Sequence, residues 1–198
     1  MDPGSRPGLR AVSPETPASA PGLPGVTAEA LESYFGRALR LARRSYEDGS
    51  YPVGAVIVSA DGRVIGSGFN RTQARQSPIH HAEIEAMERA RRHLVAAAPG
   101  SVLLVTTGEP CLMCLGAILN APAIGSLAWA LGPVSPAGSA LAAVRASGYN
   151  AARVDGLQVL AQPSPAARRA SCELLYRWCI ERADPRAAYF AGVCGPAG

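Results

Sequence analysis

The chain has 198 residues, of which 48% are apolar and 17% are charged, so it can bury a substantial core. This composition excludes a wholly disordered chain, a collagen-like repeat and a long coiled coil. The net charge is +4, and all 19 basic residues are Arg. Arg without Lys, together with abundant Ala, Gly and Pro, indicates genomic composition bias more than selection for a basic, nucleic-acid-binding surface.

The first part of the chain lacks the pattern of a folded domain. Residues 1–27 contain six Pro and four Gly with no apolar periodicity, which predicts a disordered tail. They also lack the apolar segment of a secretory signal peptide. The uncharged segment 110–144 is interrupted by Pro and Gly too often to form a membrane-spanning helix of about 20 residues. We therefore expect a cytoplasmic protein with no membrane segment.

Helical and strand periodicities then alternate along the chain. Thr27 is a suitable N-cap for a helix with Leu31 and Tyr34 on its apolar face. Short apolar runs on both sides of Asp61-Gly62 indicate a β-hairpin, because this dipeptide favours the tight turn between antiparallel strands. The predicted elements of this half are a helix over 28–47, strands over 53–58 and 63–69, a polar loop over 70–77 and a helix over 78–97.

The second half continues with single strands separated by helices. Pro99-Gly100 ends the preceding helix, and Pro110 suits the first turn of the next one. Alternation of strands and helices after one hairpin predicts a three-layer α-β-α sandwich around a five-stranded mixed sheet. The predicted elements here are strands over 101–107, 123–130 and 156–160 and helices over 111–119, 139–147 and 163–182. The globular domain then covers 28–184, and a C-terminal tail covers 185–198.

Five cysteines are present, at positions 111, 114, 172, 179 and 194. An odd number in a chain of this size does not indicate a disulfide-stabilised scaffold. Cys172 and Cys179 lie on one predicted helix with a rise of about 10.5 Å between them, which no disulfide spans. We expect both to be reduced core thiols.

Cys111 and Cys114 belong to a pattern with a different chemistry. They lie at the start of one predicted helix, and His81 lies near the start of another. Two thiolates and one imidazole form a ligand set suited to tetrahedral Zn²⁺. Three protein ligands leave a fourth position for water, as in catalytic zinc sites. The sequence thus predicts one Zn²⁺ per chain, bound by His81, Cys111 and Cys114.

Glu83 is the candidate catalytic residue of this site. It lies two residues after His81, so its side chain diverges from that ligand along the helix. A carboxylate beside the metal, but not bound to it, can take a proton from an activated water and deliver it later. Glu83 is therefore predicted to transfer protons.

Three other interpretations remain open at this point. The two cysteines can form a redox pair, in which case the His-x-Glu pattern is a coincidence. His81 can be an ordinary core histidine. A purely structural zinc site would need a fourth ligand, for which His80 and His93 are candidates. His80 points elsewhere on the helix, and His93 lies about 18 Å from His81 along it.

The two motifs resemble those of a known enzyme superfamily. His81-Ala-Glu-Ile, followed by Glu109-Pro-Cys-Leu-Met-Cys-Leu-Gly-Ala-Ile118, is similar to the zinc-dependent cytidine deaminase-like proteins. Within them, bacterial tRNA adenosine deaminases and guanine and cytosine deaminases are the most similar. The resemblance covers about residues 27–129 and continues more weakly to about residue 182.

This resemblance implies a fold, a reaction and a set of roles. It implies a five-stranded sheet between helices, a homodimer, and hydrolytic release of an exocyclic amine as ammonia. It agrees with zinc ligation by His81, Cys111 and Cys114 and with proton transfer by Glu83. It also implies that Asn70 hydrogen-bonds the substrate; the alternative is that this Asn is an ordinary loop cap.

The expected substrate follows from two departures from the tRNA enzymes. The loop 132–138 is uncharged where those enzymes carry a charged pattern, and the final helix ends in 176–182 without their paired Phe and basic cluster. Few groups then neutralise phosphates, which supply much of nucleic-acid affinity. We expect a free nucleobase or nucleoside of guanine, adenine or cytosine type. The alternatives are a tRNA-specific adenosine deaminase and a non-catalytic zinc-binding dimer, although the latter has no need of Glu83.

Overall fold

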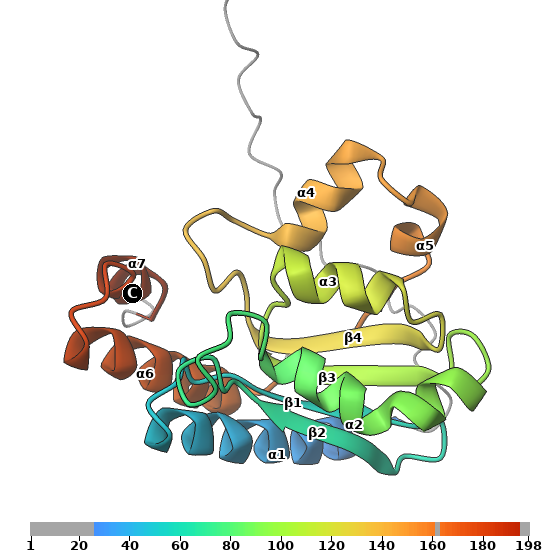
Figure 1. Cartoon of the computed structure of the whole chain (residues 1–198), viewed down its shortest axis with the longest axis horizontal. Helices are drawn as coiled ribbons and strands as arrows, with labels where there is room; N and C mark the ends of the chain where they lie inside the picture. The colour runs from blue at the N-terminus through green and yellow to red at the C-terminus, as the bar shows by residue number, and fades with distance from the viewer. Residues whose placement is uncertain (1–25, 161–162, 195–198) are drawn as a thin grey trace, which may run out of the picture.

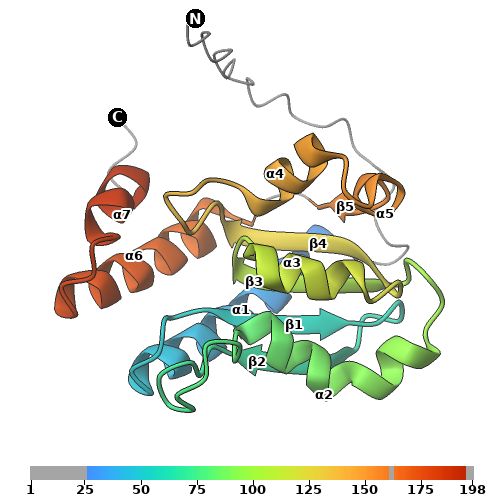
Figure 2. The ribbon, with the colours of Figure 1, turned by 45° about the horizontal axis from the view of Figure 1, so that its top comes forward.

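The centre of the fold is one mixed β-sheet, seen in Figures 1 and 2. The structure, a computed structural model, describes residues 26–160 and 163–194. The strand order is β2-β1-β3-β4-β5; β1 is antiparallel to both β2 and β3, and the pairs β3–β4 and β4–β5 are parallel. The predicted five-stranded mixed sheet is confirmed. The strands are β1 (Gly54–Val58), β2 (Val64–Phe69), β3 (Val102–Gly108), β4 (Ile124–Leu131) and β5 (Gln158–Val159).

Helices cover both faces of the sheet (Figure 2). Successive residues of β1 face opposite layers: Ile57 packs with α2 and α3, whereas Val56 packs with α1. This burial on both sides explains why β1 is continuously apolar and does not alternate with polar residues. The helices are α1 (Ala28–Glu47), α2 (Ala82–Ala96), α3 (Leu112–Leu119), α4 (Ala140–Ser147), α5 (Ala151–Asp155), α6 (Pro165–Glu181) and α7 (Ala187–Cys194).

Glycines allow α2 to lie directly on β2. A methyl group on Gly68 would be 2.4 Å from the Ala82 carbonyl oxygen and 2.5 Å from the Ala86 amide nitrogen. Gly66 is equally close to the next turn of the same helix. The backbones of β2 and α2 are therefore in contact, and this contact fixes the start of α2 relative to the sheet.

The start of α2 differs from the sequence prediction. The helix begins at Ala82 with His81 as its N-cap, four residues later than predicted from Pro78. The residues just before Ala82 form turns. Among them, the His80 carbonyl accepts a hydrogen bond from the Arg71 amide at 2.9 Å. This pairing with the loop after β2 prevents an earlier helix start and leaves His81 at the helix end.

The chain after α6 also differs from the sequence prediction. Part of the segment 185–198, predicted as a tail, forms α7, because the Phe190 side chain is fully buried against α6. The division of the chain at residues 28 and 184 stays a prediction, and most of the predicted tail 1–27 lies outside the described residues. The short helix α5 is an additional element that the periodicity did not reveal.

One cysteine prediction was wrong. Cys172 forms a disulfide with Cys194, with a Cα–Cα distance of 5.6 Å, and is therefore not a reduced thiol. Without α7, the sequence offered no partner for Cys172; the fold places Cys194 beside it. Cys179 is a free, buried thiol, as expected. The disulfide ties the end of α7 to the middle of the preceding helix.

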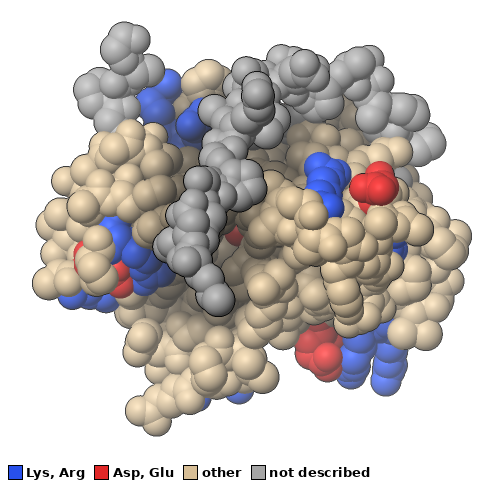
Figure 3. Space-filling view, turned by 90° about the horizontal axis from the view of Figure 1, so that it is seen from above, with Lys and Arg blue, Asp and Glu red and all other residues tan. Residues whose placement is uncertain are grey.

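The arginines on the face shown in Figure 3 lie in separate groups with uncharged surface between them. Several arginines are paired with acids: Arg89 with Glu85, and Arg177 with Glu181. The positive charge visible on this face is therefore not gathered into one patch.

Among the helices in residues 26–160 and 163–194, none has both the length and the apolar character of a membrane span.

The close contact between β2 and α2 leads to a stability prediction. Gly68→Ala should lower the free energy of unfolding by about 1–3 kcal/mol, because the added methyl group overlaps the backbone of α2. Gly36→Ala is the matched control: its methyl group on α1 would be 3.8 Å from the nearest atom, Arg40 Nη1. It should raise that free energy by about 0.5–1 kcal/mol. Urea unfolding of both variants checks this, and equal stabilities would contradict it.

Candidate active site

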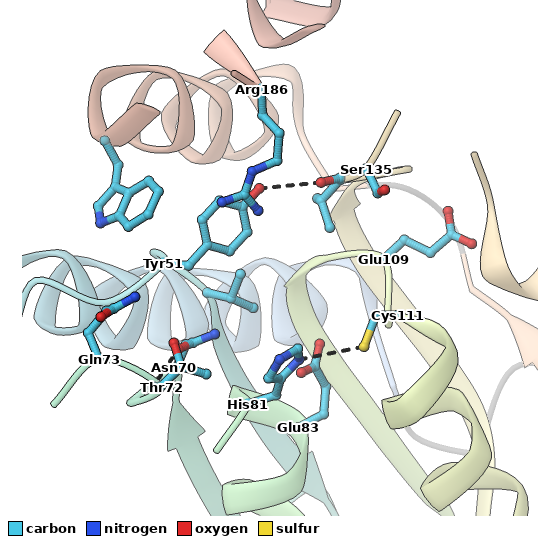
Figure 4. Close-up of a pocket in the computed structure, with 13 residues that line it drawn as sticks. Tyr51, Asn70, Thr72, Gln73, His81, Glu83, Glu109, Cys111, Ser135 and Arg186 are labelled. Atoms are coloured by element: carbon cyan, nitrogen blue, oxygen red, sulfur yellow. Dashed lines mark hydrogen bonds between the residues drawn. The ribbon is translucent and has the colours of Figure 1, made fainter. Parts of the chain in front are cut away.

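Three predicted ligands meet where two helices begin. His81 is the N-cap of α2 and Cys111 the N-cap of α3, and neither side chain caps its own helix. The His81 Nδ1 atom lies 3.5 Å from the Cys111 sulfur and 3.6 Å from the Cys114 sulfur (Figure 4 shows the pair His81–Cys111). The three ligand atoms lie within 4.8 Å of one another. The structure therefore brings together all three residues that the motifs predicted.

These distances fit a tetrahedral zinc ion. With Zn–S near 2.3 Å and Zn–N near 2.0–2.1 Å, tetrahedral geometry separates an imidazole nitrogen from a thiolate sulfur by about 3.6 Å. The observed separations of 3.5 and 3.6 Å agree with this value. Neither His80 nor His93 joins the group among the described residues. A set of three ligands is the form that catalytic zinc sites take.

The ligands are also electrostatically coupled. Interaction with the neighbouring Cys114 side chain lowers the pKa of Cys111 to about 4, with a further contribution from His81. The same contact, together with burial, raises the pKa of Cys114. The hydrogen bond with Cys111 raises the pKa of His81. The site therefore favours a negatively charged sulfur that faces a partial positive charge at the start of α3.

Glu83 lies beside the ligands and not among them. Its side chain is buried, with the residue 3% exposed, and burial raises the pKa of its carboxyl group. The Thr106 hydroxyl donates a hydrogen bond to Oε1 at 3.2 Å, and the Cys114 thiol donates one to Oε2 at 3.4 Å. A carboxyl group with a raised pKa, held in place on both oxygens, is suited to accept and release a proton.

Thr106 is a site residue that the sequence analysis missed. It lies on β3, next to α2, and its hydroxyl fixes the Glu83 carboxylate. Its sequence signal is weak: a hydroxyl residue in the apolar strand that precedes Cys111. In a buried strand such a hydroxyl needs a hydrogen-bond partner, but that partner can equally be the backbone, as it is for the adjacent Thr107, which accepts a hydrogen bond from the Gly54 amide.

Asn70 is buried at the end of β2 and lines the same cavity as His81 and Glu83. Its Oδ1 atom accepts hydrogen bonds from the amide and the hydroxyl of Thr72, both at 2.9 Å. This is the loop-capping arrangement considered above. It also fixes the amide plane and leaves the Nδ2 group available to donate into the cavity. Both interpretations of Asn70 therefore fit the same conformation.

The cavity above the ligands has a volume of about 270 Å³. Figure 4 shows His81, Glu83 and Cys111 at one end and Arg186, next to Tyr51, at the other. Trp178 lines it and meets the Tyr51 ring edge-on, with centroids 5.3 Å apart. The residues that line the cavity are Tyr51, Val53, Asn70, Thr72, Gln73, His81, Glu83, Glu109, Cys111, Val134, Ser135, Trp178 and Arg186.

Glu109 and Arg186 are further lining residues without an assigned role from the sequence. The Glu109 carboxylate accepts hydrogen bonds from the Ser139 hydroxyl and the Leu141 amide, so it anchors the start of α4. Arg186 comes from the loop before α7. Arg186 could not have been found from a motif, because it reaches the cavity through a contact between distant parts of the chain. Glu109 lies in the same motif as the two cysteines, two residues before Cys111, and that spacing could have marked it as a site residue.

Comparisons with known proteins agree with this geometry. The family model described as "Cytidine and deoxycytidylate deaminase zinc-binding region" matches residues 28–129. The structure of a protein named NE0047 in complex with 2,6-diaminopurine is similar, with 30% sequence identity and a TM-score of 0.57. The similarity covers 77% of this chain and 82% of that one.

Curated relatives match shorter parts of the chain. A tRNA(Ile)-lysidine synthase of Deinococcus deserti is 43% identical over 97 residues, which are 49% of this chain and 18% of that protein. A guanine deaminase of Bacillus subtilis is 41% identical over 88 residues, 44% of this chain and 56% of the relative. A tRNA-specific adenosine deaminase of Aquifex aeolicus is 38% identical over 88 residues, 44% and 58% of the two chains. The chain spans less than two thirds of each of these relatives.

Metal analysis of cysteine variants tests the ligand assignment. The protein should carry about one zinc ion per chain, and Cys111→Ser or Cys114→Ser should lose it, because a hydroxyl does not replace a thiolate as a zinc ligand. Cys179→Ser is the matched control: it alters a buried free thiol outside the site and should keep the metal. Elemental analysis after dialysis measures the content. Full zinc in both ligand variants would show that other residues bind the ion.

Proposed function

Since the chain belongs to the cytidine and deoxycytidylate deaminase family, we propose that it is a zinc-dependent hydrolytic deaminase of a free nucleobase or nucleoside. Its substrate carries an exocyclic amine of the guanine, adenine or cytosine type, which leaves as ammonia. The observation that supports this most directly is the buried Glu83 carboxylate, held beside three zinc ligands at one end of a cavity.

The chain's own residues account for the steps of the reaction. His81, Cys111 and Cys114 would hold the zinc ion, which when bound would supply an activated water as the nucleophile at neutral pH. The water oxygen adds to the amine-bearing ring carbon, and Glu83 takes one proton from this water and delivers it to the amine nitrogen. The C–N bond then breaks and ammonia leaves, the oxygen stays on the carbon as a carbonyl group, and the second water proton ends on the ring nitrogen. Thr106 holds the Glu83 carboxylate through this transfer, and the Asn70 amide orients the ring.

A small substrate is favoured because the C-terminal segment forms part of the cavity wall. Trp178 of α6 and Arg186 before α7 both line it. The Tyr189 hydroxyl donates a hydrogen bond to the Pro133 carbonyl at 2.7 Å, which joins α7 to the loop 132–138. That loop is uncharged, and the arginines on the face in Figure 3 are dispersed. A polynucleotide would find few groups there to neutralise its phosphates.

The second candidate is deamination of adenosine in tRNA. The relatives named for tRNA and for guanine match nearly equally, with 38% and 41% identity over 88 residues each. Sequence similarity therefore does not separate the two, and the cavity wall formed by Trp178 and Arg186 decides our preference.

The proposed homodimer and cytoplasmic location rest on the family resemblance. An apolar groove between α2 and α3, which includes Met87 and the exposed Val95, is the face we propose for the dimer.

A substitution of Glu83 tests the proton transfer. Glu83→Gln keeps the size and the hydrogen bond from Thr106 but cannot carry a proton. We expect zinc to be retained and turnover to fall by roughly 10²–10⁴-fold, the usual contribution of a general acid–base group. Glu173→Gln is the matched control: this acid is exposed on α6, lines neither the cavity nor the groove proposed for the dimer, and should turn over normally. Normal turnover in Glu83→Gln would remove Glu83 from the mechanism.

Salt dependence separates the two substrate classes. Ammonia release is measured with guanine, adenine, cytosine, their nucleosides and an anticodon stem-loop RNA, between 50 and 200 mM salt. We expect turnover of a base or nucleoside with little change over this range. An RNA enzyme would instead lose affinity with a log–log slope of about −0.7 per phosphate contact on a single strand. Activity on the stem-loop alone would establish the tRNA alternative.

A further inference from the structure

Arg186 lies at the end of the cavity away from the zinc ligands. Figure 4 shows it beside Tyr51, with His81 and Glu83 on the far side of that ring. The guanidinium carbon is 4.2 Å from the centroid of the Tyr51 ring. Stacking of this kind holds a planar guanidinium in one orientation and excludes water from one of its faces. Among the described residues that line the cavity, it is the only Arg or Lys.

Asp184 also holds the Arg186 side chain in place, through hydrogen bonds. Its Oδ1 atom accepts hydrogen bonds from the Arg186 backbone amide at 2.9 Å and from Nε at 2.8 Å, and its Oδ2 atom accepts one from Nη2 at 2.7 Å. These bonds lower the pKa of Asp184 and raise that of Arg186, so both groups stay charged. The pair is therefore a rigid ion pair with no net charge.

One edge of this guanidinium remains available. Within the described parts of the chain, no hydrogen bond from Nη1 of Arg186 is present, and the side chain is 33% exposed. Nη1 has two N–H donors in a fixed fork. A substrate whose amine-bearing carbon lies beside Glu83 would direct its opposite edge, or its ribose, toward this end of the cavity. The two N–H groups of Nη1 then face the edge of the base, or the ribose, that lies away from the amine. This is the part in which the candidate bases and nucleosides differ from one another.

We propose that Arg186 is a specificity-determining residue whose free guanidinium edge donates hydrogen bonds to an uncharged oxygen or nitrogen acceptor of the substrate. Asp184 is its positioning residue, and it also keeps this end of the cavity neutral. A phosphate group would gain little attraction from the neutral pair and would be repelled by the nearby carboxylate. The enzyme therefore selects bases or nucleosides over their 5′-monophosphates. This inference rests on the proposed function, because it assumes that the cavity binds such a substrate.

Kinetics and equilibrium binding of zinc-loaded full-length variants test the proposal. The ligands are guanine, adenine and cytosine, their nucleosides and the nucleoside 5′-monophosphates. Arg186→Gln should raise KM and Kd for the neutral substrate by about 10- to 100-fold with kcat nearly unchanged, as expected for loss of a charged donor that binds substrate and transition state alike. Arg177→Gln is the matched control. Arg177 also pairs with an acid and lies over an aromatic ring, Tyr46, but it does not line the cavity.

Asp184→Asn tests the second part of the proposal, that Asp184 neutralises the charge of Arg186. The amide oxygen can still accept a hydrogen bond from Arg186, but the guanidinium charge is no longer neutralised. We expect the preference for nucleoside over 5′-monophosphate to shrink by about tenfold or more, because a free guanidinium binds phosphate strongly. Zinc content and melting temperature are measured in parallel. If Arg186→Gln does not fold, the preference for nucleoside over 5′-monophosphate in Asp184→Asn still tests the role of Arg186.

The outcomes separate the two proposals. Equal KM and Kd in Arg186→Gln and Arg177→Gln, or an unchanged phosphate preference in Asp184→Asn, would overturn the role of Arg186 and leave the deaminase proposal intact. Binding that depends on Arg186 without any ammonia release would support the role and overturn the deaminase proposal. If the wild-type protein binds none of these ligands, both are wrong.

Discussion

The site depends on one geometric constraint: two helices must begin at the same end of the sheet, where two parallel strands finish. β2 and β3 are both antiparallel to β1 and therefore run in the same direction, so their carboxyl-terminal ends lie at the same end of the sheet. α2 and α3 start there. The N-cap residues of these helices, His81 and Cys111, then face each other across 3.5 Å. Because neither side chain caps its helix, both can bind a cation. The glycine contacts between β2 and α2 are what make this approach possible.

Much of this arrangement could be predicted because its signals are local. Apolar periodicity, Asp61-Gly62 and Pro110 marked the elements around the site, and the strand–helix order implied their layers. The ligand set was predictable because thiolate and imidazole chemistry restricts the metal. Burial of Glu83 could not be inferred from its spacing, since a carboxylate near a helix start is usually exposed. It becomes buried here because Thr106, on a neighbouring strand, satisfies one of its oxygens.

The parts that could not be predicted depend on contacts between distant residues. α7 is short and contains Gly192, so its intrinsic helix signal is weak. It forms because Phe190 is buried, because Cys194 bonds to Cys172, and because Tyr189 reaches the loop 132–138. Each of these is a tertiary contact that overrides local propensity. Arg186 enters the cavity only as a consequence, since it lies in the loop that leads into α7.

The residues proposed for the chemistry lie within the family match, whereas Arg186 and Trp178, at the other end of the cavity, lie beyond it. The family model ends at residue 129 and contains the zinc ligands, Glu83, Thr106 and Asn70. Val134, Ser135, Trp178 and Arg186 line the same cavity from beyond that limit. Similarity within residues 28–129 therefore supports the proposed reaction but does not identify the substrate. In our proposal the substrate is selected by side chains that a loop, a disulfide and the last helix bring to the other end of the cavity, where the tertiary fold and not the motif determines what they contact.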